Sequence, residues 1–154
     1  MISIPQGLFQ ELKKMAEERG SSVEELVIDA LTRQLDPDVR VKIYLELHEK
    51  YLKEAEELYA RGDLAQAGEK YWGAVAALLN AVAEKRGWRH YSHRDYAEII
   101  ERLSEELREP LGRLFASCER LHSNFYHSFL TRVNFDAHRE DALRLMEMLR
   151  RLVA

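Results

Sequence analysis

The stretch Tyr71–Ala83, YWGAVAALLNAVA, constrains the fold of this chain more than any other. Only Gly73 and Asn80 interrupt a run of thirteen residues that is otherwise apolar or aromatic. A surface helix carries one apolar stripe, whereas a helix that is apolar on every side must be covered on every side. The run is too short for a membrane span, which needs roughly 20 apolar residues. We therefore expect the central helix of a helical bundle, with the Asn80 amide tying helices or subunits together.

Turn and cap signals divide the rest of the chain into helices joined by short connections. Ser22 with Glu25 has the spacing of a capping box, and Pro37 suits the first turn of a helix. Glu109-Pro110 is a helix break. No alternating strand pattern follows residue 5, so the chain reads as all-α, most simply an up-down bundle. The expected helices are Leu8–Gly20, Ser22–Asp36, Pro37–Arg61, Asp63–Gly87, Ser92–Glu109, Leu111–Arg132 and Phe135–Val153.

We predict two parts of the chain, an N-terminal strand-helix-helix segment of residues 1–36 and a helical bundle of residues 37–154. Ile2 and Ile4 alternate with Ser3, which predicts a very short extended piece. A strand, a helix, Gly-x-Ser and a second helix resemble the ribbon-helix-helix fold of small DNA-binding repressors. Residues 1–36 contain four Lys or Arg against seven Asp or Glu, and phosphate contacts supply most of the affinity for DNA. Dimerisation or packing is therefore favoured over DNA binding for this segment.

Composition excludes several classes of function. The formal net charge of −4 gives no global attraction to nucleic acid or to an anionic membrane. The single cysteine, Cys118, forms no internal disulfide and has no metal-ligand spacing around it. The six histidines suggest no metal site, and no cofactor motif is visible. Without a targeting or membrane segment, we expect a cytoplasmic protein that does not contact the membrane.

The segment ERLHSNFYHSFL, Glu119 to Leu130, is the best candidate for chemistry. On a helix, Arg120, Asn124 and His127 fall on the side opposite the apolar residues around Leu121. A guanidinium can hold a phosphoryl oxygen through paired hydrogen bonds, and an imidazole can move the proton of a ribose hydroxyl. Asn124 lies between these two groups and could orient either one. The competing interpretation is a polar stripe that only faces solvent.

Three segments in this order resemble the archaeal PaREP family, which is usually placed in the HEPN superfamily of α-helical domains. They are GDLAQAGEKYWGAVAALLNAVAEKRG, SHRDYAEIIERL and RLHSNFYHSFL. The resemblance implies a homodimeric helical bundle. Active HEPN proteins are metal-independent ribonucleases with Arg, four to six residues, then His, and Arg120 and His127 fit that spacing. The resemblance thus implies that Arg120 binds phosphate and that His127 moves the 2′-hydroxyl proton. A polar residue usually follows the Arg, whereas Leu121 stands here.

Three hypotheses follow for the function. The first is a HEPN-like homodimer that binds RNA or nucleotide and acts as a metal-independent endoribonuclease. The second is a non-catalytic module that binds a protein partner, as in a toxin–antitoxin or nucleotidyltransferase-type pair. The third is a DNA-binding regulator that uses residues 1–36. A large apolar patch away from Arg120 would favour the second hypothesis.

Overall fold

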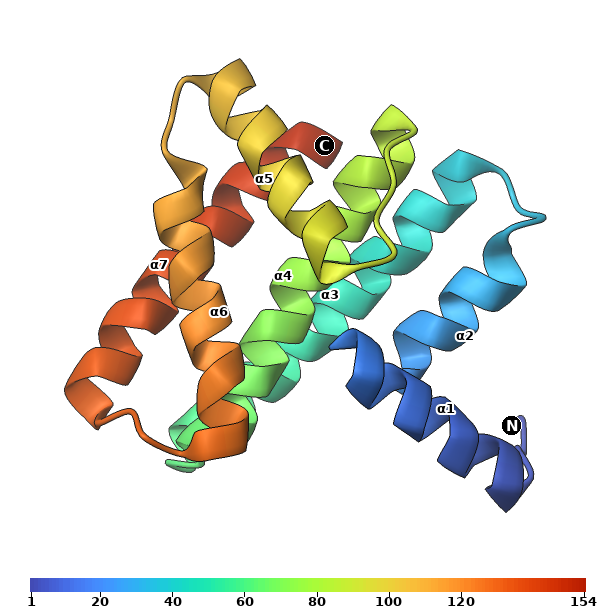
Figure 1. The fold of residues 1–154 in the computed structure, drawn as a ribbon, viewed down its shortest axis with the longest axis horizontal. Helices are drawn as coiled ribbons and strands as arrows, with labels where there is room; N and C mark the ends of the chain where they lie inside the picture. The colour runs from blue at the N-terminus through green and yellow to red at the C-terminus, as the bar shows by residue number, and fades with distance from the viewer.

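The computed structural model describes all 154 residues and contains seven helices and no strand. The all-α prediction is confirmed. Four long helices, α3 (Pro37–Ala60), α4 (Leu64–Arg86), α6 (Leu111–His127) and α7 (Arg132–Val153), alternate in direction and form the bundle (Figure 1). The shorter α5 (His93–Leu107) packs against α6. Two further helices, α1 (Gln6–Arg19) and α2 (Val23–Thr32), form a hairpin beside α3 and α4.

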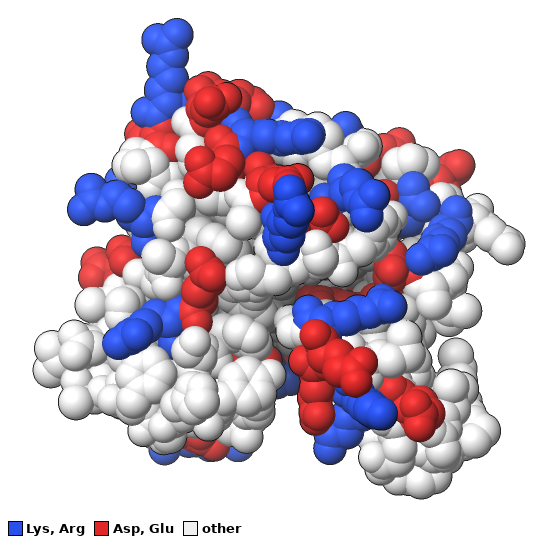
Figure 2. Space-filling view, in the orientation of Figure 1, with Lys and Arg blue, Asp and Glu red and all other residues white.

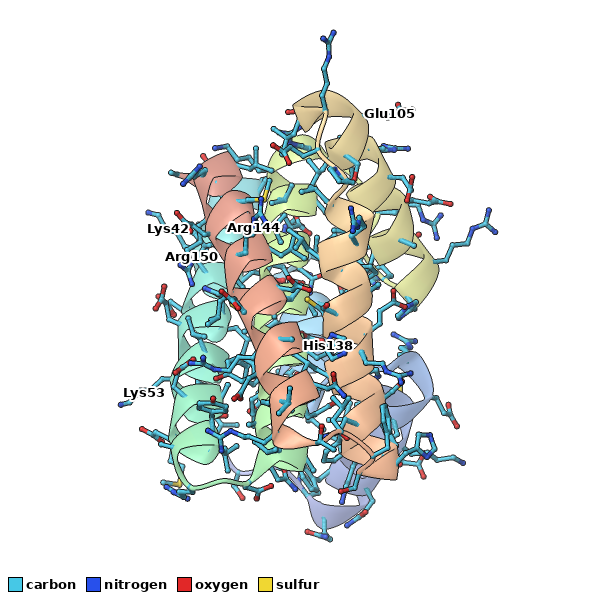
Figure 3. All side chains as sticks on the ribbon, turned by 90° about the vertical axis from the view of Figure 1, so that its left-hand side faces the viewer. Lys42, Lys53, Glu105, His138, Arg144 and Arg150 are labelled. Atoms are coloured by element: carbon cyan, nitrogen blue, oxygen red, sulfur yellow. The ribbon has the colours of Figure 1, made fainter.

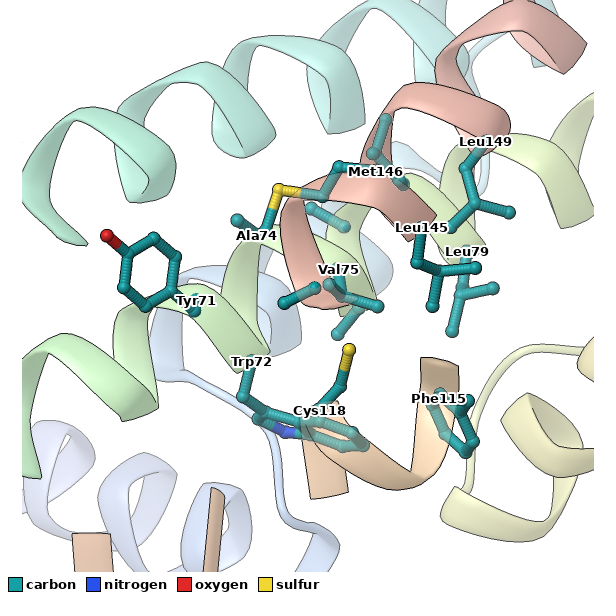
Figure 4. Close-up of a cluster of buried hydrophobic side chains, with 14 of the residues drawn as sticks. Tyr71, Trp72, Ala74, Val75, Leu79, Phe115, Cys118, Leu145, Met146 and Leu149 are labelled. Atoms are coloured by element: carbon teal, nitrogen blue, oxygen red, sulfur yellow. The ribbon is translucent and has the colours of Figure 1, made fainter. Parts of the chain in front are cut away.

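Helix α4 is the centre of the bundle, as its sequence predicts. It contacts α3, α6, α7 and α5, and every residue from Ala74 to Ala83 is buried. Its alanines let the neighbouring helices approach closely, while Tyr71, Trp72 and Leu79 fill the space between them (Figure 4). Full burial of one leucine side chain contributes about 1.5–3 kcal/mol, so α4 supplies much of the stability of the bundle.

Most predicted helix ends are confirmed by the capping contacts. The side chains of Ser22 and Ser92 each accept a hydrogen bond from the third residue of their helix within a complete capping box. Asp63 accepts from the backbone of Gln66 at 3.2 Å. Gly20 and Gly87 end their helices with positive φ angles of 63° and 69°, a conformation that glycine adopts at little cost.

The helix predicted for Leu111–Arg132 is too long, and this prediction is wrong. Helix α6 ends at His127, and Ser128 adopts a left-handed conformation with φ of 46°. The Asn124 side chain causes the stop because its Oδ1 accepts the backbone N–H groups of Phe129 and Leu130, both at 2.8 Å. Those two amides would otherwise bond to carbonyls of α6, so the helix cannot continue.

The α1–α2 hairpin stands at the edge of the molecule. The central core cluster takes all its buried residues from Leu47 onward, and the hairpin adds only the partly buried Ile28. The extended piece predicted at Ile2–Ile4 forms no strand, because no second strand is present in the chain to pair with it. The division of the chain at residue 36 stays a prediction.

Candidate functional site

The candidate site lies along the seam between α6 and α7, two antiparallel helices that pack directly on each other (Figure 3). Arg120 and His127 are both exposed on α6. They are seven positions apart in the chain, so they lie on one face, about 10 Å apart along the helix axis. Asn124 does not share this open face, because only 2% of it is exposed.

The Arg120 guanidinium is held toward the His127 end of α6. Its central carbon lies 4.5 Å from the centroid of the Phe129 ring, within the range of a cation–π contact. Phe129 is fixed in turn by its backbone N–H, which donates to Asn124 Oδ1. Asn124 thus acts on Arg120 through the turn that it caps. The sequence reasoning expected an amide beside the reacting groups, whereas the structure buries that amide beneath them.

No carboxylate neutralises Arg120. Glu119, its neighbour in the chain, pairs with His93 at 2.9 Å, and Asp141 accepts a hydrogen bond from Ser117. An exposed guanidinium without a partner keeps all its donors available for an external oxyanion. The cation–π contact with Phe129 is not a hydrogen bond, so it occupies none of the N–H donors of the guanidinium.

A second histidine, which the sequence reasoning missed, adjoins Arg120 from α7. Ser117 Oγ donates to Asp141 Oδ2 at 2.6 Å and lies 3.0 Å from His138 Nδ1. Since the serine has only one proton to give, its oxygen accepts from Nδ1–H of the imidazole. This chain of contacts selects the tautomer of His138 that carries its proton on Nδ1. The other ring nitrogen, Nε2, therefore keeps its lone pair.

The charge state of His138 fits the same tautomer. Burial lowers the pKa of His138; Asp141 opposes this shift, and the nearby positive charge of Arg120 adds to it. The neutral ring is therefore favoured at pH 7. His138 lies at the boundary of α6 and α7 (Figure 3), where a neutral imidazole beside a free guanidinium can accept a proton from a group bound to that guanidinium.

Two more arginines extend the positive charge along the seam. Arg113 of α6 and Arg144 of α7 line a hollow of about 300 Å³ together with Glu109 and Leu114. Arg113 is seven residues before Arg120, so it lies two turns away on the same face of α6. The seam thus presents three arginines from two helices. Beyond His127, Figure 2 shows a surface without charged side chains over the lower ends of α6 and α7.

Exposed apolar side chains explain that uncharged surface. Tyr126, Phe129 and Val133 are 53%, 41% and 80% exposed. Tyr126 lies in the last turn of α6, Phe129 in the connection after His127, and Val133 in the first turn of α7. A nucleic-acid base or a second protein surface could stack on these side chains. Three exposed apolar residues close together are typical of a binding surface.

Family comparison agrees with the sequence resemblance. Residues 43–146 match the archaeal PaREP1/PaREP8 family. The chain belongs to this family. The matched range includes Arg120, His127 and His138, and it leaves out the α1–α2 hairpin. No curated protein and no solved structure matches the chain.

The remaining predictions on single residues are also settled by the structure. His48 is buried and contacts the carbonyl of Ala74 and the guanidinium of Arg150. Asn80 contacts His90 at 3.0 Å and so ties α4 to the loop before α5. Burial raises the pKa of Cys118, which makes its thiol unreactive. No helix is long and apolar enough to cross a membrane.

The sequence contains only part of the signal for His138. His138 and Asp141 are three residues apart, so they share a face of α7, and Ser117 faces them from α6. Spacing within one helix shows which residues share a face, but it does not show which face of another helix lies opposite. His138 could therefore be placed beside Arg120 only in three dimensions.

Proposed function

We propose that the α6–α7 seam binds the phosphate of single-stranded RNA or a nucleotide, and that the protein cleaves RNA without a metal ion. Arg120 would hold a phosphoryl oxygen, and Arg113 and Arg144 would bind further along the strand. The observation that carries this proposal is an unpaired Arg120 beside His138, a histidine whose neutral form and tautomer are both defined. The HEPN-like fold that the resemblance implies is part of the same proposal.

The proposed reaction needs one proton acceptor and one proton donor. The ribose 2′-hydroxyl loses its proton to a histidine and attacks the adjacent phosphorus. The bond from phosphorus to the 5′-oxygen breaks, and that oxygen takes up a proton, leaving a cyclic phosphate and a 5′-hydroxyl. The resemblance assigns the first transfer to His127. His138 is a second candidate for this role because its Nε2 already carries the lone pair that a base needs.

Cleavage of single-stranded RNA in EDTA tests the catalytic part. We expect activity in the wild type and a loss of about 10²-fold or more in His127→Ala if that residue transfers the proton. Arg120→Ala should weaken RNA binding as well as turnover. Arg94→Ala, which changes an exposed residue outside the seam, serves as the matched control. Equal turnover by wild type and His127→Ala would exclude His127, and loss in His138→Ala instead would assign the base to α7.

RNA binding without cleavage is a separate outcome of the same experiment. Titration of a labelled RNA at several salt concentrations measures the number of phosphates that the protein neutralises. The slope is that of the logarithm of the binding constant against the logarithm of the salt concentration. Replacement of one arginine by alanine, at Arg113, Arg120 or Arg144, should reduce its magnitude by about one. A slope that none of these changes alters would show that the seam is not the binding surface.

We also propose that the chain forms a homodimer through its α1–α2 hairpin. This hairpin and α3 enclose an apolar groove of about 1100 Å³, lined by residues such as Ile2, Ile4, Leu8, Phe9, Val27 and Leu31. Ile2 is 90% exposed and Leu31 is 71% exposed. Leu8 is also more than half exposed, so an extended apolar surface meets water here.

A second copy is the occupant that this groove favours. A standard interface buries about 800 Å² on each partner, so a stable dimer would cover the groove together with its rim and the Ile2–Ile4 arm. The groove lies beside an extended apolar arm, Ile2–Ile4, whose backbone forms no hydrogen bond within the chain. The same chain therefore offers both the groove and a segment to fill it, which a twofold interface requires.

Analytical ultracentrifugation tests this dimer. We expect a dimer for the wild type and a monomer for Leu31→Asp, while Val133→Asp, which changes another exposed apolar residue, should remain dimeric. Dissociation by Val133→Asp alone would place the interface at the lower ends of α6 and α7, so that two seams meet. A wild-type monomer would instead support a different protein as the occupant, as the second hypothesis requires.

A further inference from the structure

A polar hollow lies beneath the turn that joins α1 to α2, and no residue of the α6–α7 seam lines it. Its volume is about 80 Å³, several times what one water molecule needs. Ser21 and Glu25 form the side of the turn, and Trp72 of α4 and Tyr51 of α3 form the opposite walls. In Figure 2, a recess near the C-terminal end of α1 has acidic atoms in its depth.

Two buried polar atoms at this hollow have no hydrogen-bond partner. Glu25 is only 6% exposed, and its Oε2 accepts the backbone N–H of Ser22 at 3.3 Å. Its other oxygen, Oε1, and the Ser21 hydroxyl oxygen are both buried and unpaired. Buried polar atoms in folded proteins are nearly always bonded, so these two atoms are available to a bound group. When Glu25 is ionised, both oxygens can accept hydrogen bonds from such a group.

The charged groups around the hollow leave one carboxylate without a basic partner. Three carboxylates line the hollow, and two of them already have such a partner: Lys50 pairs with Glu24, and His122 pairs with Glu69. Lys70, which also lines the hollow, pairs with Glu54. Glu25 alone has no cationic partner.

The second hollow on the other side of Ser21 and Glu25 does not supply this cation. It measures about 30 Å³, and Arg19 and Asp29 lie on its walls. Arg19 is exposed and forms no ion pair with Glu25. Burial raises the pKa of Glu25 to about 7, and the negative charges of the neighbouring Glu24 and Glu69 shift the pKa in the same direction. A bound cation would favour the ionised form.

We propose that the hollow binds a primary ammonium group, which donates hydrogen bonds to Glu25 Oε1 and Ser21 Oγ while its carbon chain leads out to solvent. An ammonium is a compact charge with three donors, which matches two acceptors in a small space better than the wide planar fork of a guanidinium. No group of three or more ligating side chains suits a metal ion.

Titration with methylammonium chloride at pH 8, followed by calorimetry and by tryptophan fluorescence, tests the proposal. We expect saturable binding, and we expect none of it with tetramethylammonium chloride or sodium chloride at the same concentration. Tetramethylammonium has the same charge but no N–H donor. Equal heats from all three salts would overturn the proposal, as would no binding at all, which would show that water alone fills the hollow.

Two variants locate the binding. Glu25→Gln keeps the capping box, because glutamine also accepts from the Ser22 amide, and it should weaken binding at least about tenfold. Ser21→Ala keeps the carboxylate and should weaken binding less. Glu98→Gln, which changes an exposed carboxylate of α5, is the matched control. Unchanged affinity in both Glu25→Gln and Ser21→Ala would overturn the assignment, and the second variant decides the matter if the first fails to fold.

The ammonium could belong to a free amine or to a lysine side chain of another protein. Propylammonium represents the first source, and a short blocked peptide with one lysine represents the second. The same peptide with its lysine acetylated is the control, since acetylation removes the charge. Tighter binding of the lysine peptide than of propylammonium would indicate a protein ligand, and the reverse order would indicate a free amine.

Discussion

Gly68 sets the distance between α4 and α6, and its replacement by alanine tests whether this contact positions the seam. A methyl group on Gly68 would lie 2.9 Å from the carbonyl oxygen of Leu121 and 3.4 Å from the Phe135 ring. The first distance is shorter than any real contact of this kind. Because the oxygen belongs to the backbone of α6, it cannot move aside as a flexible side chain could, and the whole helix must shift.

The size of the effect follows from two opposing terms. Alanine is favoured over glycine in a helix interior by about 1 kcal/mol. Overpacking of a close contact costs about 1–3 kcal/mol, and here the obstacle is rigid. We therefore expect Gly68→Ala to lower the free energy of unfolding by up to about 2 kcal/mol, which corresponds to a fall in Tm of roughly 4–8 °C for a chain of this size.

Urea unfolding followed by circular dichroism measures this change, and Gly112→Ala provides the control. Gly112 also lies in a helix, but a methyl group there would meet nothing closer than a Glu101 side-chain oxygen at 3.7 Å. Gly112→Ala should therefore stabilise the protein by about 0.4–1 kcal/mol. Equal stabilities for the two variants would refute the close-contact argument. Since Leu121 adjoins Arg120, Gly68→Ala should also weaken RNA binding at temperatures where it stays folded.

Three further results are expected. Burial lowers the pKa of His48 below 6.5, so the unfolded chain binds the proton before the folded chain does as the pH falls. The free energy of unfolding should therefore decrease between pH 6.5 and 5, and it should decrease less steeply in His48→Gln. Asn124→Ala should cost about 1–3 kcal/mol in urea unfolding because two backbone amides lose their acceptor, and Asn124→Asp should recover most of it. Cys118 should react with a thiol reagent only after unfolding, and modification of the native protein within minutes would contradict its burial.

The helices were predictable because their signals are local. The caps at Ser22, Asp63 and Ser92 each depend on residues three positions apart, and a run apolar on all sides required a central helix. The end of α6 was not predictable in the same way. The sequence around Asn124 has good helical spacing, and only the capture of two later amides by its side chain stops the helix.

The candidate site was predictable in part. The sequence alone determined that Arg120 and His127 share a face of one helix, since helical spacing places residues seven apart on the same side. Only the tertiary structure decided that Asn124 is buried, that His138 of α7 joins Arg120, and that Glu25 lies unpaired beneath the α1–α2 turn. The physical reason is that the periodicity of a helix is set by its own backbone, whereas the neighbours of a side chain depend on how separate helices pack.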